Sequence, residues 1–317
     1  MPEGVMKRVL SIDGGGIRGI IPAAVLAEIE HRTGKRIAEI FDLTAGTSTG
    51  GIIALGLSVP GEDGRPLHRA LALKELYETK GVDIFRINLW RKLSTMGGYI
   101  DAEYTHHILE GILEDYLGET TLDSCLTNTL VTSYDIESRK PFVFRSWEEK
   151  HKPVRMKEAA RATSAAPGFF EPAVLELDGV RHTLIDGGVF INNPALSAYL
   201  EAARIFPGED EFMVVSLGTG ENTKKITYEE ARNWGKIDWA LPVLDVIFDG
   251  MNDAVDYHLT QILGDNYYRF QNVFTCKDYD MSLAAETEDE IRFIMDETAN
   301  FIELRNEEID RLCEVLS

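Results

Sequence analysis

The sequence predicts an α/β protein with a mainly parallel central sheet, and two observations lead to this prediction. Between residue 7 and about residue 60, the apolar pattern alternates between strand and helix, as the crossovers of a parallel sheet require. In the same region two glycine-rich segments, 13–19 and 46–50, each separate an apolar strand from a helical pattern. The 317 residues suffice for one large domain of this class with additions.

The first strand–turn–helix unit has a strand at Arg8–Ile12, the glycine-rich segment DGGGIRG (13–19), and a helix over 20–31. Its glycines also match the G-x-G-x-x-G spacing of a dinucleotide-binding site. Such a site needs an acidic residue about 20 positions on, at the end of the second strand. Here that strand ends at Ala45, and the acidic partner of the ribose is missing. A phosphate-binding P-loop is excluded too, because Ile20 stands where its lysine would be.

The second unit contains the segment GTSTG (46–50), which has the G-x-S-x-G spacing of a nucleophile elbow. A buried strand is predicted over 39–45 before it, and an apolar helix is predicted after it. A nucleophilic serine needs this context, because the tight turn lifts the hydroxyl clear of the sheet. The small neighbours Gly46 and Gly50 let backbone and substrate approach closely. We therefore predict that Ser48 is a nucleophile.

The first glycine-rich segment is predicted to form an oxyanion hole from Gly14, Gly15 and Gly16. Ester cleavage builds negative charge on the carbonyl oxygen, and consecutive glycines allow successive backbone amides to point into one concavity. Arg18 is expected to orient this loop or to contact a phosphate, with Gly19 supporting the turn. A plain strand–helix turn is the alternative, although one glycine would suffice for it.

The general base is predicted at Asp186, which ends the second strand of a predicted hairpin and precedes Gly187 and Gly188. A carboxylate can take the serine proton directly when a partly dry pocket raises its basicity. A Ser–Asp–His triad would need a histidine after this aspartate. Only His258 follows it, inside a predicted helix where a surface or packing role is expected. A simple turn-forming role of the Asp-Gly-Gly segment is the alternative.

In this order the three motifs resemble those of the patatin-like phospholipase family. The resemblance includes the segment ATSAAPGFFEP (162–172), which is similar to a segment lining the acyl pocket there and suggests Phe169 and Phe170 as pocket residues. It implies a three-layer α/β/α sandwich and hydrolysis of glycerolipid acyl esters, of the phospholipase A or lysophospholipase type. Ser48 would be the nucleophile and Asp186 its base, through an acyl-enzyme and without a metal or other cofactor.

Two other functions stay open. An acyltransferase would pass the same acyl group to an alcohol or a thiol. The family also includes stand-alone bacterial members of similar size that act as nucleotide-activated, membrane-degrading defence effectors. In that case the basic segment 139–161 and the region after residue 220 are candidate sensors for an activating small anionic ligand. For the basic segment, a solvated face that balances acidic neighbours is the alternative.

The resemblance defines a catalytic domain over 7–220, and we expect 221–317 to form a mostly helical extension packed on the same domain. Within this extension, 285–316 predicts one long acidic amphipathic helix. The segment 84–93 mixes aromatic and basic residues, which suits a lid or a membrane-interface surface. An ordinary packed excursion is the alternative for that segment.

The chain is strongly acidic: 32 Lys and Arg against 53 Asp and Glu give a net charge of −21. This charge argues against nucleic acid as a partner and against non-specific attraction to anionic membranes. The sequence has no evident secretory signal or bilayer-spanning apolar run, and its three cysteines suggest reduced thiols. We expect a cytoplasmic protein that contacts membrane surfaces transiently to reach a phospholipid or lysophospholipid. Lipid headgroup, acyl length and assembly into homo-oligomers are left open.

Overall fold

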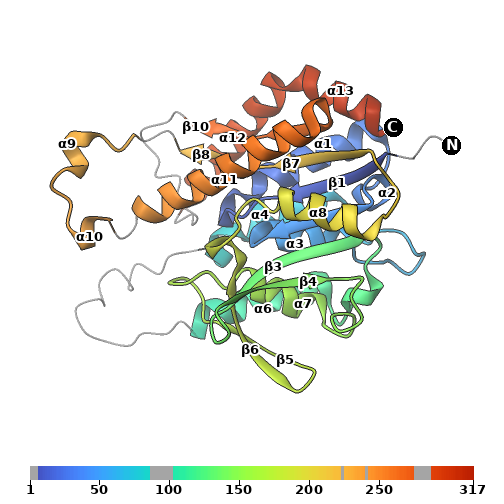
Figure 1. Ribbon diagram of the computed structural model, residues 1–317, viewed down its shortest axis with the longest axis horizontal. Helices are drawn as coiled ribbons and strands as arrows, with labels where there is room; N and C mark the ends of the chain where they lie inside the picture. Colours follow the sequence, from blue (N-terminus) through green and yellow to red (C-terminus); the bar gives the residue numbers. More distant parts are fainter. Residues whose placement is uncertain (1–5, 86–102, 223–224, 240–241, 275–286) are drawn as a thin grey trace.

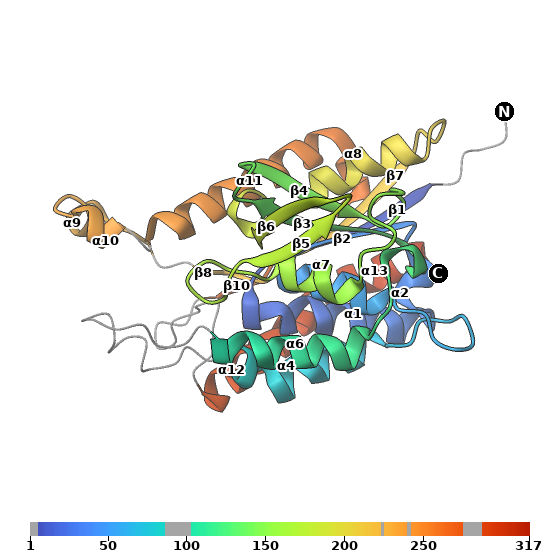
Figure 2. The same ribbon diagram turned by 90° about the horizontal axis from the view of Figure 1, so that it is seen from below.

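The computed structural model describes residues 6–85, 103–222, 225–239, 242–274 and 287–317. Within them a central β-sheet lies between two layers of helices (Figures 1 and 2). This three-layer α/β/α arrangement confirms the fold class predicted from the sequence. Most of the segment 84–93 lies outside the described residues.

The described residues form one eight-stranded sheet with the order β5-β6-β3-β2-β1-β7-β9, in which β4 also pairs with β3. The pairs from β3 through β2, β1 and β7 to β9 are parallel, whereas β4, β5 and β6 form antiparallel pairs. The sheet is therefore mainly parallel, as predicted. Its strands are β1 (Lys7–Ile12), β2 (Leu43–Thr47), β3 (Asn128–Asp135), β4 (Lys140–Arg145), β5 (Ala173–Leu177), β6 (Val180–Asp186), β7 (Phe212–Leu217) and β9 (Tyr267–Phe270). A separate short pair joins β8 (Glu221–Asn222) to β10 (Val273–Phe274).

One face of the sheet is covered by α8 and α11, and the other by α1, α3, α4, α6, α7, α12 and α13 (Figure 2). The helices among the described residues are α1 (Ile20–Thr33), α2 (Ile37–Ile40), α3 (Thr49–Leu57), α4 (Ala70–Phe85), α6 (Glu103–Leu117), α7 (Met156–Thr163), α8 (Ala195–Ile205), α9 (Tyr228–Ala231), α10 (Lys236–Trp239), α11 (Pro242–Leu263), α12 (Glu288–Leu304) and α13 (Asn306–Leu316).

The side chains of β1 show how one strand serves both layers. Val9 points to the face under α8 and α11, where it packs in a cluster with Ala198 and Leu259. Leu10 and Ile12 point to the opposite face and belong to the larger cluster under α1, α3, α4, α12 and α13. Because both faces are covered, all three of these β1 side chains are fully buried, which explains why apolar residues occupy both faces of the strand.

The strand predicted over 39–45 is wrong at its start. Ile37–Ile40 form the helical turn α2, and β2 begins only at Leu43. The side chain of Glu39 gives the reason, because its carboxylate accepts the backbone amide of Arg36 at 2.9 Å and caps a helical turn.

The single helix predicted over 285–316 is also wrong, because the chain forms α12 and α13, which meet at Arg305. Both helices pack on α1 and bury apolar side chains in the same cluster, Phe301 from α12 and Leu312 from α13. The break between them allows both apolar faces to reach one core.

The chain after residue 220 contributes to the central sheet as well as to the helical layers. Strand β9 pairs in parallel with β7 at the edge of the sheet, and α11 packs against α8. Ile12, Leu217 and Phe270 are aligned across β1, β7 and β9. The end of β9 therefore lies at the same edge of the sheet as the first glycine-rich segment.

Candidate active site

Ser48 lies on the tight turn between β2 and α3. Its backbone has φ 54° and ψ −123°, a region that residues with a side chain seldom adopt. Both flanking glycines are required by close backbone contacts. A Cβ on Gly46 would lie 2.1 Å from the Gly50 carbonyl oxygen, and one on Gly50 would lie 2.2 Å from the Ile12 carbonyl oxygen. Ser48 therefore has the strand–turn–helix geometry of a nucleophile elbow.

The pairing of β3 explains how Asp186 reaches this turn. One edge of β3 pairs with β4 from Leu130 to Asp135. The other edge pairs with β2 as far as Thr132 and with β6 from Ser133 onward. Strands β2 and β6 therefore meet end to end along one edge, and Asp186, opposite Ser133, follows directly on the end of β2.

The serine and the aspartate are joined by a short hydrogen bond. The Ser48 hydroxyl donates to Asp186, with 2.6 Å between Oγ and Oδ2. The other carboxylate oxygen accepts the backbone amide of Gly188 at 2.7 Å. Gly187 lets this turn lie against β3, because a Cβ there would be 2.2 Å from the Thr132 hydroxyl oxygen. The carboxylate is thus held with one oxygen directed at the serine.

Burial sets the basicity of this carboxylate. Asp186 is 6% exposed, and loss of hydration raises its pKa to about 6, although the hydrogen bonds from Ser48 and Gly188 oppose the rise. The hydrogen bonds that the described residues make to Ser48 and Asp186 involve no histidine. His258 is exposed on α11, where its ring packs on Tyr257.

The glycine-rich segment lies against the elbow, since a Cβ on Gly14 would be 3.3 Å from the Cβ of Ser48. The expectation that Gly14 offers its amide to an oxyanion is not met, because that amide donates to the Asn192 carbonyl oxygen at 3.1 Å. In the described part of the chain, no acceptor is hydrogen-bonded to the amides of Gly15 and Gly16. Gly16 has φ 57°, which favours glycine. The available donors of a candidate oxyanion hole are therefore these two amides.

Two side-chain hydrogen bonds hold this loop against the segment that follows β7. The Thr219 hydroxyl donates to the Gly14 carbonyl oxygen at 2.7 Å. The same side chain packs so closely that a Cβ on Gly15 would lie 2.2 Å from its oxygen. Arg18 donates to the Gly220 carbonyl oxygen at 3.3 Å and ties the loop to the segment that follows β7.

Two further residues contact the elbow: Thr163, from the segment 162–172, and Tyr77, which belongs to none of the motifs. Thr163, at the end of α7, accepts the Ser48 amide at 2.8 Å, and Tyr77 of α4 accepts the Thr49 hydroxyl. A Cβ on Gly19 would lie 2.3 Å from the Thr49 hydroxyl oxygen, so this glycine makes room for the elbow. The two contact residues lie 115 and 28 positions from their partners, so only the fold brings them together.

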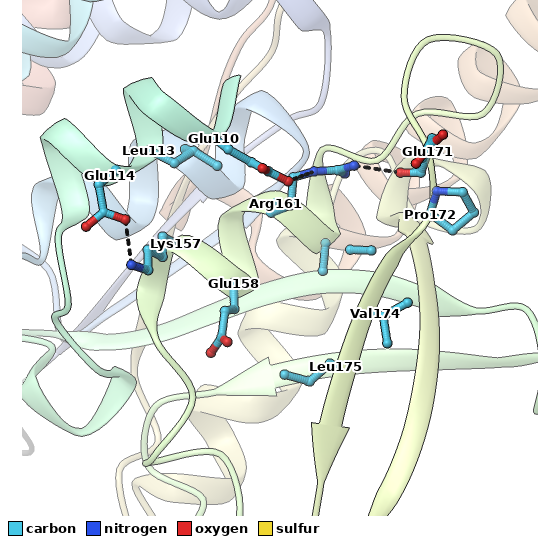
Figure 3. A pocket seen from close by; sticks show the side chains of 12 residues that line it. Glu110, Leu113, Glu114, Lys157, Glu158, Arg161, Glu171, Pro172, Val174 and Leu175 are labelled. Carbon is cyan, nitrogen blue, oxygen red and sulfur yellow. Dashed lines mark hydrogen bonds and ion pairs between the residues drawn. The ribbon is translucent and has the colours of Figure 1, made fainter. Parts of the chain in front are cut away.

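The expected pocket residues Phe169 and Phe170 pack in the apolar cluster around α6, α7 and β3. A cavity of about 360 Å³ lies between α6, α7 and β5 (Figure 3), and none of Phe169, Phe170, Ser48 and Asp186 lines it. This cavity is therefore separate from the serine–aspartate pair. Its lining residues are Glu110, Leu113, Glu114, Lys157, Glu158, Arg161, Ala162, Glu171, Pro172, Ala173, Val174 and Leu175.

Cations of the basic segment 139–161 are paired with carboxylates. Lys157 contacts Glu114 at 2.5 Å and Arg161 contacts Glu110 at 3.3 Å, both at the cavity (Figure 3). Ion pairs with carboxylates are also made by Arg145, Lys150, Lys152 and Arg155. This pairing favours a face that balances acidic neighbours.

The described residues contain no group of three or more His, Cys, Asp and Glu side chains suited to a metal ion. None of the helices among them is both long and apolar enough to cross a membrane. Cys125 is a free thiol whose pKa burial raises to about 11.

Together these features define a class of α/β/α protein with a serine–aspartate pair and a glycine-rich loop at the carboxyl edge of its parallel strands. The family model described as "Patatin-like phospholipase" matches residues 10–199. The chain belongs to this family.

Comparisons with individual proteins give the same family. Patatin-like protein 2 of Oryza sativa subsp. indica is 36% identical over 315 residues, which covers 85% of this chain and 78% of that protein. Patatin group J-1 of Solanum tuberosum is 31% identical over an alignment of 333 residues, which covers 92% of this chain and 83% of that protein. Among solved structures, human GIVD cytosolic phospholipase A2 matches with a TM-score of 0.40 and 12% identity, over 68% of this chain and 43% of that one. That structural likeness is too low to add to the assignment.

The steric role of the elbow glycines can be tested with two helical Gly→Ala variants. Gly50→Ala should lower the free energy of unfolding by about 1–3 kcal/mol, because its Cβ would overlap the Ile12 carbonyl oxygen. Gly111→Ala, on α6 where a Cβ meets nothing within 4 Å, should raise it by about 0.4–1 kcal/mol. Urea unfolding followed by circular dichroism measures both values. Equal effects of the two substitutions would contradict the packing described for the elbow.

Proposed function

We propose that this protein hydrolyses acyl esters of lipids through a catalytic dyad of Ser48 and Asp186. The observation that carries this proposal is the 2.6 Å hydrogen bond between Ser48 Oγ and Asp186 Oδ2 on a nucleophile elbow. Membership of the patatin-like phospholipase family supports lipid esters as the substrate class. Phospholipids and lysophospholipids are therefore the substrates we propose, reached by peripheral contact with a membrane surface.

The first half-reaction acylates the enzyme. Ser48 Oγ attacks the ester carbonyl carbon, and its proton passes to Asp186 Oδ2. The negative charge that develops on the carbonyl oxygen is assigned to the amides of Gly15 and Gly16, which have no other acceptor among the described residues. The bond to the alcohol oxygen then breaks, and that oxygen takes the proton from Asp186. An alcohol leaves, and the acyl group stays on Ser48 as an ester.

The second half-reaction returns the enzyme to its starting state. Asp186 takes a proton from water while the water oxygen attacks the acyl carbon. The bond to Ser48 Oγ breaks, and the proton on Asp186 returns to that oxygen. The product is a fatty acid, and the serine and the carboxylate are both regenerated.

The buried carboxylate supports a mechanism without histidine. With a pKa of about 6, raised from 3.8 by burial, Asp186 accepts a proton more readily than an exposed aspartate does. It nevertheless stays mostly ionised at neutral pH, which a general base requires. One residue can therefore serve as base and acid in both halves of the reaction.

Substitution of the two dyad residues tests the mechanism on phosphatidylcholine in mixed micelles, with released fatty acid as the readout. Ser48→Ala should reduce hydrolysis to the uncatalysed background, because no nucleophile is left. Asp186→Asn keeps the shape of the side chain and removes the base, so it should lower kcat/KM by about 10²–10⁴-fold. Asp178→Asn, in the turn of the same hairpin, is the matched control and should retain activity. Activity at the control level in either dyad variant would refute the mechanism.

The pKa of the base predicts the dependence of activity on pH. Asp186 must be ionised to take the serine proton, so kcat/KM should rise about tenfold per pH unit below pH 6 and level off above it. Because burial also raises the pKa of Asp13 to about 6, Asp13→Asn is the necessary control and should keep the midpoint. A profile that is flat between pH 5 and 7, or a midpoint lost in Asp13→Asn, would contradict the assignment.

A further inference from the structure

We infer that Arg269, on β9, is a positioning residue for the glycine-rich loop of the oxyanion hole and acts through its ion pair with Asp13. This inference rests on the proposed function, since that function gives the loop its catalytic task. Arg269 lies beyond residues 10–199, which the family model matches. A part of the chain outside that match thus supports the site.

The Arg269 guanidinium joins three elements of the fold. Its Nη2 contacts Asp13 Oδ2 at 2.7 Å, Nη1 donates to the Ser216 hydroxyl at 2.9 Å, and Nε contacts the Asp256 carboxylate at 3.1 Å. These partners come from the end of β1, from β7 and from α11. Because the guanidinium is planar and rigid, the three contacts fix the direction in which it faces Asp13.

Asp13 depends strongly on this contact. The residue is 1% exposed, and its other oxygen, Oδ1, is buried without a hydrogen-bond partner among the described residues. Burial raises its pKa to about 6, while the charge and the hydrogen bond of Arg269 act in the opposite direction. Without the guanidinium, the carboxylate would lose its side-chain partner, and a buried group in that state protonates or moves.

A movement of Asp13 would reach the reacting atoms, because the loop is tightly packed at this point. A Cβ on Gly50 would lie only 2.7 Å from the Asp13 carbonyl oxygen. A Cβ on Gly14, which follows Asp13 in the chain, would lie 3.3 Å from the Cβ of Ser48. The amides assigned to the oxyanion follow within three positions. Donors to an oxyanion act only when they are held in place, and a misplacement of about 1 Å can cost 10²-fold in rate.

The test compares Arg269→Gln and Arg269→Lys with wild type, using p-nitrophenyl butyrate for kcat and KM and a fluorescent fluorophosphonate for the labelling rate of Ser48. Arg269→Gln should lower kcat and the labelling rate by about tenfold or more, with KM changed by less than about twofold. Arg269→Lys keeps the charge without the planar fork and should recover part of the loss.

Two further variants separate positioning from stability. Arg32→Gln removes an arginine of α1 that pairs with Glu28 and with Asp310 of α13 and contacts no residue of the proposed site. It should lower the melting temperature but keep kcat. If Arg269 acts through Asp13, the double variant Asp13→Asn/Arg269→Gln should be no slower than Arg269→Gln alone, because the two losses are coupled.

The outcomes separate this inference from the proposed function. Wild-type protein that labels at Ser48, with Arg269→Gln labelling at the same rate, would overturn the inference alone. A loss confined to KM, or additive losses in the double variant, would overturn it as well. Wild type that neither labels nor hydrolyses the ester would refute the proposed function and the inference with it. If Arg269→Gln does not fold, the kcat of Arg269→Lys is compared with that of Arg32→Gln instead. An unchanged kcat in Arg269→Lys would then contradict the positioning role of Arg269.

Discussion

The end-to-end meeting of β2 and β6 along one edge of β3 is the constraint on which the rest of the site depends. The last pair of β2 with β3 is followed at once by the pair of Ser133 with Asp186, so the two strand ends face each other. One strand end leads into Ser48 and the other carries its carboxylate partner. A shift of β6 by one residue would turn Asp186 to the other face of the sheet. The glycines around both strand ends are needed because the backbones approach so closely there.

Two buried carboxylates at this edge are compensated in different ways, and the difference suits their roles. Asp186 accepts a hydroxyl and a backbone amide, both neutral donors, which leaves it able to take a proton during the reaction. Asp13 is paired with the Arg269 cation, which favours its ionised form and a fixed position. In the proposed mechanism, a single type of side chain therefore serves as the base at one strand end and as an anchor at the other.

The sequence predicted those parts of the site that short backbone turns bring together. The glycine spacing around Ser48 could be interpreted because only glycine leaves room for the close backbone contacts of this turn. Gly187, directly after Asp186, is required for a similar steric reason. The sequence could not show that the Gly14 amide donates to the Asn192 carbonyl oxygen, because this hydrogen bond depends on how the fold places a loop far along the chain. The contact between Asp13 and Arg269 spans 256 positions and follows no motif, so only the alignment of β1, β7 and β9 reveals it.

The fold class was predictable for a related reason. Buried parallel strands give continuous apolar runs, and the helices between them give their own period, so the alternation is visible in the sequence. The amphipathic pattern over 285–316 continues through the break at Arg305, since both helices face the same core. Periodicity identifies a buried face, but it does not fix the point at which a helix ends.

Isolation of the acyl-enzyme tests the central claim most directly. The protein would be mixed with a phosphatidylcholine carrying heavy-isotope acyl chains and quenched in acid within the first turnover. Proteolysis and mass spectrometry would then locate the label. The dyad mechanism predicts an acyl ester on the peptide containing Ser48, absent from the Ser48→Ala variant. Release of labelled fatty acid with that peptide unmodified, or with the acyl group on another residue, would contradict it.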